Sequence, residues 1–418
     1  MNKAEENMED NNKKPFICFI SGHLPNSKSK EAGQKIVYEH LKELSERYSI
    51  ILISFANRIE LNGIDKTLNE LCIKVEIIPI NFRTRVLSVI RNYKLPWYVG
   101  LRYNKNVMKI IDKEREIYKI ELFWLEYLQM AQYAYVLKKK DERWFIVCHD
   151  IISQMYERQN FKFAGIKALL FFLDIQRVRF WEKRVLGFFD KVMVLSKKDR
   201  QLISEYNSNI EIIYPFIYFS SRNYKRKLSI VPQIIFFGAM NRNENEDAMV
   251  WFLKHIFPKI KAKIPETQLV ILGANPTDKV TRLAQKFDKV HVTGFVETPD
   301  VFFEQAWFSI VPLRLGAGVK IKVLESAARS VPIVATNIGA EGIEMTEQDG
   351  LFIRDDPNAF VEVCLKLLSS KKEIELLSNN INTWFQYNYV PKMLNKIYLD
   401  NIIQENVTTG SSELWSRY

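Results

Sequence analysis

The chain has 418 residues, of which 47% are hydrophobic, and a formal net charge of +11. This length exceeds what one hydrophobic core usually organises, so we expect two globular domains. The charge predicts an anionic partner, which can be nucleic acid, acidic phospholipid or a phosphorylated small molecule. The longest apolar run, at 168–173, is far shorter than the roughly 20 residues that a membrane-spanning helix needs, so we expect no span.

The first segment, 1–14, is polar and acidic, which argues against a signal peptide and predicts a disordered N-terminus. The 4 cysteines are scattered and form no C-x-x-C pair, so the sequence indicates neither a zinc site nor a disulfide framework. A reducing cytoplasm therefore fits best. The positive charge adds the inner face of the plasma membrane as a peripheral location.

From residue 15 to residue 220, short apolar runs alternate with helical patterns, which predicts an N-terminal domain built on a parallel sheet. The expected strands are Phe16–Ile20, Ile50–Ser54, Val75–Ile78, Leu122–Trp124, Phe145–Val147 and Val192–Leu195. The segment around the boundary at Ser220 is polar and basic, and we expect a linker over 221–230.

The alternation is clearer over 231–383, where we expect a second domain of the same kind. Its predicted strands are Gln233–Phe237, Leu269–Leu272, Val290–Thr293, Phe308–Val311 and Ile333–Ala335. Because these runs are apolar throughout, they indicate parallel strands that helices cover on both faces. Ligands of such sheets bind outside the carboxyl ends of the strands.

The end of the chain continues past the second sheet. An aromatic helical pattern over 384–403 predicts a C-terminal helix that can pack back on the first domain. The last segment, 404–418, is polar enough to predict disorder.

The segment Pro312–Thr336, PLRLGAGVKIKVLESAARSVPIVAT, predicts a strand end, a glycine loop, a helix and a strand. Gly316 and Gly318 allow the backbone to approach a ligand closely, and the following helix N-terminus favours an anion. Lys320 and Lys322 fall at this helix start, where each cation costs up to about 1 kcal/mol unless a bound diphosphate reverses the sign. A solvated lysine pair on a surface helix is the alternative.

Glu325 lies on the same predicted helix. It follows Lys322 by three residues and precedes Arg329 by four, which is the spacing of an intrahelical ion-pair stripe. The alternative is a carboxylate that accepts hydrogen bonds from the hydroxyl groups of a ribose. The spacing is compatible with both.

Four motifs of the second half together resemble the donor site of glycosyltransferase family 4, whose members are retaining enzymes of the GT-B fold. They are FFGAMNRNENEDA at 236–248, LVILG at 269–273, VTGFV at 292–296 and LESAARSVPIVAT at 324–336, in the family's order and spacing. The resemblance implies two Rossmann-like, doubly wound domains that face a central cleft. It places the acceptor on the N-terminal side and a nucleoside-diphosphate sugar on the C-terminal side.

The resemblance also implies roles for individual donor-side residues. Glu325 matches the second glutamate of the family's E-x7-E element, which holds the donor ribose, and Phe295 and Val296 occupy the loop that usually meets the base. The loop of Gly316 and Gly318, with both lysines, resembles the diphosphate grip of the subgroup that has a G-x-G-x-K-x-K motif. Lys320 is thereby a candidate catalytic residue.

Three positions depart from the family's pattern. The first glutamate of E-x7-E is replaced by Ala317. The arginine that commonly follows the first glycine of the domain, here Gly238, is Ala239, which leaves Arg242 as a substitute donor-binding residue. The glycine that usually follows the signature helix is Ser330, which costs about 1 kcal/mol if this position must be left-handed.

On the N-terminal side, Gly33 lies where the family has a glycine-containing loop that faces the donor phosphate; an ordinary loop glycine is the alternative. The motif VCHDIIS places His149 and Asp150 just past a predicted strand end, on the acceptor side of the cleft. His149 resembles the family's cleft histidine and would orient the sugar or the acceptor. A histidine that only caps the strand is the alternative.

Two stretches, 83–109 and 161–184, interleave lysine and arginine with large apolar side chains. Both predict surfaces that can lie on anionic lipid and present the acceptor cleft to a lipid-linked substrate. Helices packed on the sheet, with their cations extended into solvent, are the alternative.

The sequence thus predicts a retaining glycosyltransferase that moves a sugar from a nucleoside-diphosphate sugar to a hydroxyl group of a glycan or lipid-linked acceptor, in cell-surface polysaccharide or glycolipid synthesis. No D-x-D element accompanies the site, so we expect neither a metal nor a cofactor besides the nucleotide sugar. A non-catalytic GT-B subunit, favoured by Ala317, is the alternative. A nucleic-acid-binding protein is suggested by the charge alone, and we expect no such partner.

Overall fold

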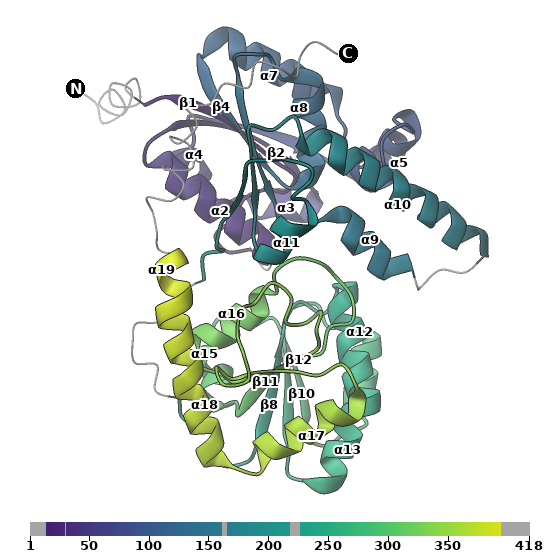
Figure 1. The fold of residues 1–418 in the computed structure, drawn as a ribbon, viewed down its shortest axis with the longest axis vertical. Helices are drawn as coiled ribbons and strands as arrows, with labels where there is room; N and C mark the ends of the chain where they lie inside the picture. The colour runs from purple at the N-terminus through teal and green to yellow at the C-terminus, as the bar shows by residue number, and fades with distance from the viewer. Residues whose placement is uncertain (1–13, 30, 161–164, 218–225, 394–418) are drawn as a thin grey trace.

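The computed structural model describes residues 14–29, 31–160, 165–217 and 226–393. It shows two parallel sheets, one above the other in Figure 1, with helices around each. The predicted fold class of two Rossmann-like domains is therefore confirmed. Residues 1–13 of the predicted N-terminal segment 1–14, the predicted tail 404–418, the boundary at Ser220 and residues 221–225 of the predicted linker lie outside the described residues.

The N-terminal sheet has seven parallel strands in the order β3-β2-β1-β4-β5-β6-β7. Alternate residues of a strand supply two separate cores, because Cys18 and Ile20 pack in one buried cluster while Ile17 and Phe19 pack in another. The strands are β1 (Phe16–Ser21), β2 (Ser49–Ala56), β3 (Lys74–Pro79), β4 (Ile120–Glu126), β5 (Arg143–Cys148), β6 (Lys191–Val194) and β7 (Ile210–Ile212).

Helices and a short 3-10 turn connect these strands. Their bounds are α2 (Ala32–Ser45), α3 (Arg58–Asn62), α4 (Leu68–Leu71), α5 (Phe82–Arg91), α6 (Trp97–Gly100), α7 (Lys105–Ile117), η1 (Leu128–Met130), α8 (Ala131–Leu137), α9 (Ile152–Asn160), α10 (Gly165–Leu186) and α11 (Lys197–Leu202). The long helix α10 extends to the side of the domain, where α5 also lies (Figure 1).

The C-terminal sheet has six parallel strands in the order β10-β9-β8-β11-β12-β13. They are β8 (Gln233–Phe237), β9 (Gln268–Leu272), β10 (Val290–Gly294), β11 (Phe308–Val311), β12 (Ile333–Ala335) and β13 (Leu351–Ile353). The accompanying helices are α12 (Asn243–Trp251), η2 (Phe252–Ile256), α13 (Phe257–Lys263), α14 (Asp278–Ala284), α15 (Asp300–Gln305), α16 (Ile321–Ala328), α17 (Pro357–Leu368), α18 (Lys371–Trp384), η3 (Phe385–Tyr389) and α19 (Val390–Met393).

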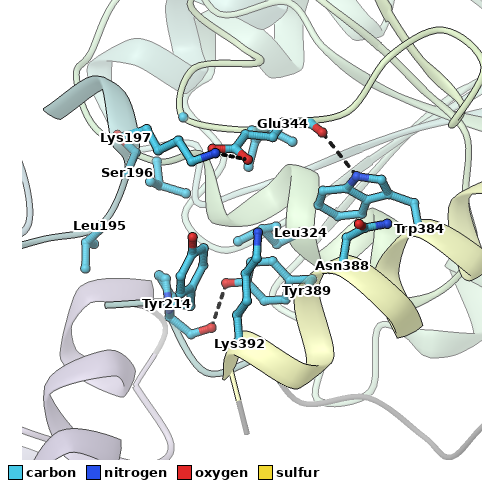
Figure 2. Close-up of a pocket in the computed structure, with 14 residues that line it drawn as sticks. Leu195, Ser196, Lys197, Tyr214, Leu324, Glu344, Trp384, Asn388, Tyr389 and Lys392 are labelled. Carbon is cyan, nitrogen blue, oxygen red and sulfur yellow. Dashed lines mark hydrogen bonds and ion pairs between the residues drawn. The ribbon is translucent and has the colours of Figure 1, made fainter. Parts of the chain in front are cut away.

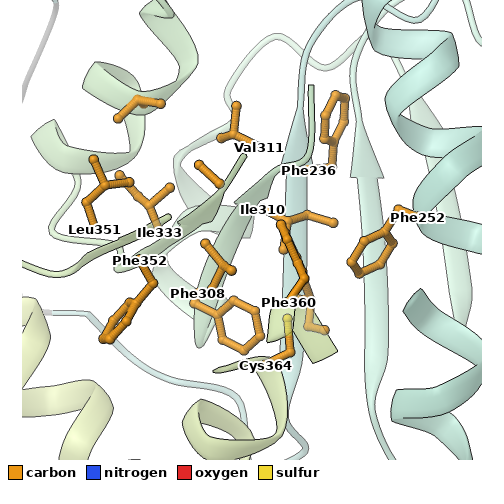
Figure 3. Close-up of a cluster of buried hydrophobic side chains, with 14 of the residues drawn as sticks. Phe236, Phe252, Phe308, Ile310, Val311, Ile333, Leu351, Phe352, Phe360 and Cys364 are labelled. Carbon is orange, nitrogen blue, oxygen red and sulfur yellow. The ribbon is translucent and has the colours of Figure 1, made fainter. Parts of the chain in front are cut away.

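Large aromatic side chains fill the space between the second sheet and its helices. Figure 3 shows Phe236 and Phe308 on strands facing Phe252 and Phe360 on helices, with Cys364 beside them. All five are fully buried. This packing fixes the positions of the strand ends, from which the loops of the site begin.

The chain passes from one domain to the other beside the C-terminal helix. The Tyr389 hydroxyl donates to the carbonyl oxygen of Pro215 at 2.7 Å, and the rings of Tyr214 and Tyr389 meet edge to face. Figure 2 shows these side chains around a cavity of about 30 Å³, where Lys197 of the first domain also pairs with Glu344 of the second at 3.0 Å. Of the predicted helix over 384–403, the part beyond 393 lies outside the described residues.

Candidate functional site

The glycine loop of the second domain lies directly against the first domain. Gly316 and Gly318 have φ angles of 99° and 69°, a region that favours glycine. A Cβ atom on Gly318 would lie 2.1 Å from Oδ1 of Asp150 and 2.7 Å from the carbonyl oxygen of His149. Any larger residue at position 318 would therefore force the two domains apart. The loop and the end of β5 form one site.

Lys320 supports this loop from inside. Its side chain is 8% exposed, and Nζ donates to the carbonyl oxygens of Ala317 and Gly318, both at 2.6 Å. Glu341 lies 3.6 Å from the same nitrogen. Burial lowers the pKa of Lys320, while the charges of Asp150 and Glu341 oppose that shift. The ammonium group thus holds the loop in shape and keeps positive charge at its base.

Lys322 occupies the first turn of α16 and points toward the end of β8. Nζ donates to Oδ1 of Asn245 at 2.5 Å and lies 4.5 Å from the centre of the Phe236 ring. A Cβ atom on Gly238 would lie 2.9 Å from this nitrogen, so glycine makes room for it. Burial lowers the pKa of Lys322 to about 7. The two lysines are therefore enclosed, and the alternative of a solvated surface pair is wrong.

Arg242 lies across the gap between the domains. Its guanidinium pairs with Glu244 at 2.6 Å and with Glu31 of the first domain at 3.2 Å. Glu31 precedes α2, the helix that carries Gly33 in its first turn. Arg242 thus lies near the start of α2, which contains Gly33, and near the end of β8. A residue that binds the donor between the two domains needs this position.

Glu325 forms the ion pair that its spacing with Arg329 predicts. Arg329 also pairs with Asp300 at 2.6 Å, so the carboxylate of Glu325 shares its partner. Lys322 turns away from Glu325 to Asn245, and the three-residue half of the predicted stripe is absent from the ion pairs of the described residues. Beyond α16, Ser330 has a φ angle of 58°. This position is therefore left-handed and carries the strain expected of a non-glycine residue.

The loop after β10 contains the two residues expected near a base. Phe295 is 55% exposed, whereas Val296 packs partly against the cluster of Ile235 and Val270. An exposed aromatic ring on a loop at a strand end can stack on a heterocycle. The structure places this loop at the same edge of the sheet as Gly238 and Gly273, whose backbone amide bonds to the Gly294 carbonyl at 3.2 Å.

On the opposite side of the cleft, His149 is held by a carboxylate. Its Nε2 lies 2.7 Å from Oε2 of Glu126, at the end of β4. The other oxygen of Glu126 lies 2.9 Å from Nδ1 of His40 and accepts a hydrogen bond from the Trp124 indole at 2.8 Å. His149 is 7% exposed and Glu126 is fully buried. The imidazole is thus fixed in orientation, with its remaining edge at the strand end.

The charge of this cluster is set by burial and pairing together. Burial alone would raise the pKa of Glu126, but the charge of His40 and the hydrogen bonds from both histidines lower it to about 2. Glu126 was not among the predicted residues. One signal for it exists in the sequence, a lone glutamate at the end of the apolar run FWLE, where a strand meets a ligand-binding edge.

Tyr127 connects His149 with Gly33. Its ring stacks on the His149 imidazole at 4.2 Å, and its backbone has a φ angle of 73°, which is unusual for a bulky residue. A Cβ atom on Gly33 would lie 2.9 Å from the Tyr127 hydroxyl oxygen. A side chain at position 33 would therefore have to displace the Tyr127 hydroxyl, so glycine suits the close approach of α2 to Tyr127.

Asp150 remains accessible to solvent although protein from both domains surrounds it. Its pKa is raised by this desolvation, while the charges of Lys320 and His149 act in the opposite direction. Asp150, the carboxylate predicted on the acceptor side, therefore lies directly against the glycine loop.

A further ion pair joins the domains at the glycine loop. Arg158 on α9 donates to the carbonyl oxygen of Gly316 at 2.6 Å and pairs bidentately with Glu341 at 2.6 and 2.7 Å. Lys198 of the first domain also pairs with Glu341. These contacts hold the two halves together. Among the described residues, no group of three or more His, Cys, Asp or Glu side chains is arranged to hold a metal ion.

The two basic, aromatic stretches are exposed only in part, because Val99, Val107, Ile175 and Val178 are buried, and residues 161–164 lie outside the described residues. None of the residues of α5 is buried, and Phe82 is 80% exposed. On α10, Ile166 and Phe180 are 74% and 69% exposed. The alternative of helices that bury their apolar side chains on the sheet therefore fails for these positions. Within the described part of the chain, no helix is long and apolar enough to cross a bilayer.

The second domain matches a known family model. Residues 231–370 match the family described as glycosyl transferases group 1. An uncharacterized 44.6 kDa protein in the cps region of Klebsiella pneumoniae is 25% identical over 252 residues, which are 56% of this chain and 62% of that protein. The match thus spans less than two thirds of this relative's length.

Solved structures extend the likeness to nearly the whole chain. WaaG, a glycosyltransferase involved in lipopolysaccharide biosynthesis, has a TM-score of 0.64 at 12% identity, covering 93% of this chain and 99% of its own. Anabaena HepE in complex with UDP and glucose has a TM-score of 0.62 at 13% identity, covering 94% and 98%. The predicted GT-B fold is confirmed, and residues 231–370 are similar to the glycosyl transferases group 1 family.

Proposed function

We propose that this chain, whose residues 231–370 are similar to the glycosyl transferases group 1 family, is an enzyme that moves a sugar from a nucleoside-diphosphate sugar to a hydroxyl group of a glycan or lipid-linked acceptor. The observation that carries the proposal is the contact of the glycine loop, at Gly318, with His149 and Asp150 of the other domain. It brings a helix N-terminus, enclosed cations and an oriented histidine to one place.

The donor diphosphate would bind at the N-terminus of α16. No side chain caps this end of the helix, and its first turn contains no acidic residue. The leaving diphosphate gains negative charge during transfer, so free amide groups and cations fixed beforehand lower the barrier. Lys322 would supply a charge near the phosphates, and Lys320 would hold the loop that presents the amides. HepE, which has the same fold, is described in complex with UDP and glucose, and this supports a nucleotide-sugar donor.

The positions of Glu325, Phe295 and His149 suggest the remaining contacts with the donor and the acceptor. Glu325 would accept hydrogen bonds from the ribose once it shares or releases Arg329, and Phe295 would stack on the base. His149 would orient the sugar or the acceptor, since Glu126 fixes its ring. We propose retention at the anomeric carbon, with the departing phosphate taking the acceptor proton, so that neither a protein base nor a metal is required.

The acceptor is proposed to belong to cell-surface polysaccharide or glycolipid synthesis. The description of WaaG and the cps region of the Klebsiella relative support this class. The exposed apolar side chains of α5 and α10, among lysines and arginines, support a peripheral position on an anionic membrane, on the inner face of the plasma membrane.

Binding and turnover with a panel of UDP-, GDP- and CMP-linked sugars test the proposal. We expect one donor to bind and to be hydrolysed slowly without acceptor, and we expect Lys322→Met to weaken donor binding and to slow hydrolysis. Lys254→Met, which changes an exposed lysine of the same domain, serves as the control. Donor binding without hydrolysis or transfer to any glycan would instead favour the non-catalytic subunit that Ala317 suggests. Binding of no nucleotide sugar would refute both.

A further inference from the structure

One buried carboxylate of the N-terminal domain lies between two imidazole rings. Oε1 of Glu126 is 2.9 Å from Nδ1 of His40, and Oε2 is 2.7 Å from Nε2 of His149. The indole of Trp124 also donates to Oε1, at 2.8 Å. Glu126 is fully buried, and both histidines are buried as well. The charge of one ring therefore affects the other through the carboxylate that they share.

The ring of His149 has one nitrogen that a ligand can reach. Nε2 is held by Glu126, and the ring of Tyr127 stacks on the imidazole at 4.2 Å, so the ring keeps one orientation. Nδ1 has no partner among the described residues and is not among their buried unpaired atoms, so it keeps accessible surface. A Cβ atom on Gly318 would lie 2.7 Å from the carbonyl oxygen of His149. Nδ1 is thus accessible on a residue that contacts the glycine loop.

The shared carboxylate calls for one positive charge. Two neutral rings would leave Glu126 as an uncompensated buried charge, which is strongly unfavourable. Two protonated rings would leave an excess positive charge in the same buried place. One carboxylate and one imidazolium give a cluster with no net charge. We therefore expect one of the two histidines to be the cation and the other to be neutral.

The surroundings of His40 favour the cation there. Glu39 and Glu43 lie on the same helix, α2, and both carboxylates favour a positive charge on His40. Burial acts to lower the pKa of His40, but the charge and the hydrogen bond of Glu126, together with the carboxylates of Glu43 and Glu39, raise it. Three carboxylates from two elements thus act on this ring in the same direction.

The surroundings of His149 are balanced without a charge on its ring. The neighbouring carboxylate, Asp150, also interacts with the buried ammonium group of Lys320, so a positive charge already compensates it. In a neutral imidazole one nitrogen donates and the other accepts. Because Nε2 of His149 faces the carboxylate of Glu126, Nε2 is the donor. Nδ1 is therefore left with a lone pair that can accept a hydrogen bond.

We propose that His40 is a positioning residue of the transfer site. As a cation it balances the charge of Glu126, so that His149 stays neutral and offers Nδ1 as an acceptor to a sugar hydroxyl. An ionised diphosphate has only acceptors and cannot bond to this nitrogen. His149 thus contacts the hydroxyl-bearing part of a substrate, while the glycine loop contacts the phosphates. The inference rests on the proposed function, which supplies the sugar.

The charge of each ring can be read in the unaltered protein by nitrogen-15 NMR of labelled histidine at pH 6.5. We expect His149 to show a neutral imidazole with its hydrogen on Nε2, and His40 to be mainly an imidazolium. Spectra of His40→Gln and His149→Gln assign the two rings among the 5 histidines. A doubly protonated His149 or a mainly neutral His40 would overturn the proposal. This readout requires no substrate.

The pH dependence of turnover tests what the charge does. Without a cation at position 40, His149 takes up the proton that balances Glu126, and its acceptor is lost at a higher pH. We expect His40→Gln to move the acidic limb of the kcat profile upward by about one to two pH units. His40→Lys keeps a cation and should restore the limb. His255→Gln, at an exposed position of the other domain, should not move it.

The same variants separate the two sources of the hydroxyl and the two proposals. A raised KM for acceptor with unchanged donor affinity assigns the hydroxyl to the acceptor, and weaker donor binding alone assigns it to the transferred sugar. An acidic limb that His40→Gln leaves in place, or that His40→Lys does not restore, would overturn the role of His40. If no sugar is transferred although both rings have the expected charges, the proposed function fails and the charge assignment stands.

Discussion

The two domains build their halves of the cleft in different ways. The glycine loop of the C-terminal half comes from one continuous segment, in which Gly316, Gly318, Lys320 and Lys322 follow each other within a few residues. The N-terminal half is a cluster around Glu126, whose partners come from α2 and from the end of β5. A local motif depends on backbone shape, whereas the cluster depends on buried charge. Single substitutions can therefore disrupt the glycine loop or the Glu126 cluster separately.

The largest effect is expected for the backbone of the C-terminal half. Gly318→Ala places a methyl group where Asp150 and the His149 carbonyl lie, on a backbone with a φ angle of 69°. Even a displacement of about 1 Å can cost on the order of 100-fold in turnover, so we expect at least that loss, measured as kcat with saturating donor.

Gly294→Ala is the control for this change. Gly294 also has a positive φ angle, 71°, but a Cβ atom there would meet nothing within 4 Å. It should lose roughly 1 kcal/mol of stability from backbone strain alone. If Gly318→Ala lost no more activity than this control, the contact between loop and strand end would have no role in turnover.

The next largest effect is expected at the centre of the N-terminal cluster. Glu126→Gln removes the buried charge that holds His40 and His149, and we expect a loss of roughly 3 kcal/mol in the free energy of unfolding. The kcat should fall more than the affinity for donor changes. Glu121→Gln, at an exposed position of the same strand, is the control, and equal effects of the two would contradict a special role for Glu126.

The pH dependence of that loss has a definite sign. The pKa of Glu126 is lowered from 4.5 to about 2, so its stabilisation is present above pH 4.5 and is lost as the pH falls toward 2. Burial would lower the pKa of His40, but the charge of Glu126 raises it above 6.5, so that contribution is lost as the pH rises through the shifted value. The difference in stability should therefore be largest between these limits.

A buried carboxylate without such partners should behave in the opposite way. Glu182 is fully buried, accepts from the Ser153 amide at 3.1 Å, and has an Oε2 atom without a partner in the described chain. Burial raises its pKa to about 7, so stability is lost as the pH rises through 7. We expect Glu182→Gln to stabilise the protein by about 2 kcal/mol at pH 8 and to have little effect below pH 4.5, in thermal or urea unfolding. Destabilisation at pH 8 would contradict this.

The smallest effect concerns the charge of the C-terminal half. Because burial lowers the pKa of Lys322 to about 7, the cation is lost as the pH rises through 7. A diphosphate prefers the protonated form, so donor affinity should fall about tenfold between about pH 6.5 and pH 8. Titration of Lys322→Met over the same range should give weaker, nearly constant affinity. Parallel profiles would place the titrating group elsewhere.

The same contrast explains how much the sequence could predict. Strands buried on both faces were predicted because their apolar runs are unbroken, as at β8. The edge strands β7 and β13, of 3 residues each, were missed, whereas β12 has the same length and was predicted because it belongs to the contiguous segment Pro312–Thr336. The glycine loop was predictable because its residues are contiguous. Glu126 was not, because its partners His149 and His40 lie 23 and 86 positions away and only the parallel sheet brings them together.

The position of the C-terminal helix determines how the cleft can open. The Tyr389 hydroxyl donates to the Pro215 carbonyl where the chain crosses between the domains. Arg158 of α9, on the other side of Figure 1, pairs with Glu341 of the second domain. The contacts between the domains are thus covalent and aromatic at one edge and ionic at the other. An opening rotation about the first contact would separate Arg158 from Glu341. Salt, which weakens such pairs, should thus shift the balance toward the open state and speed the exit of a bound product.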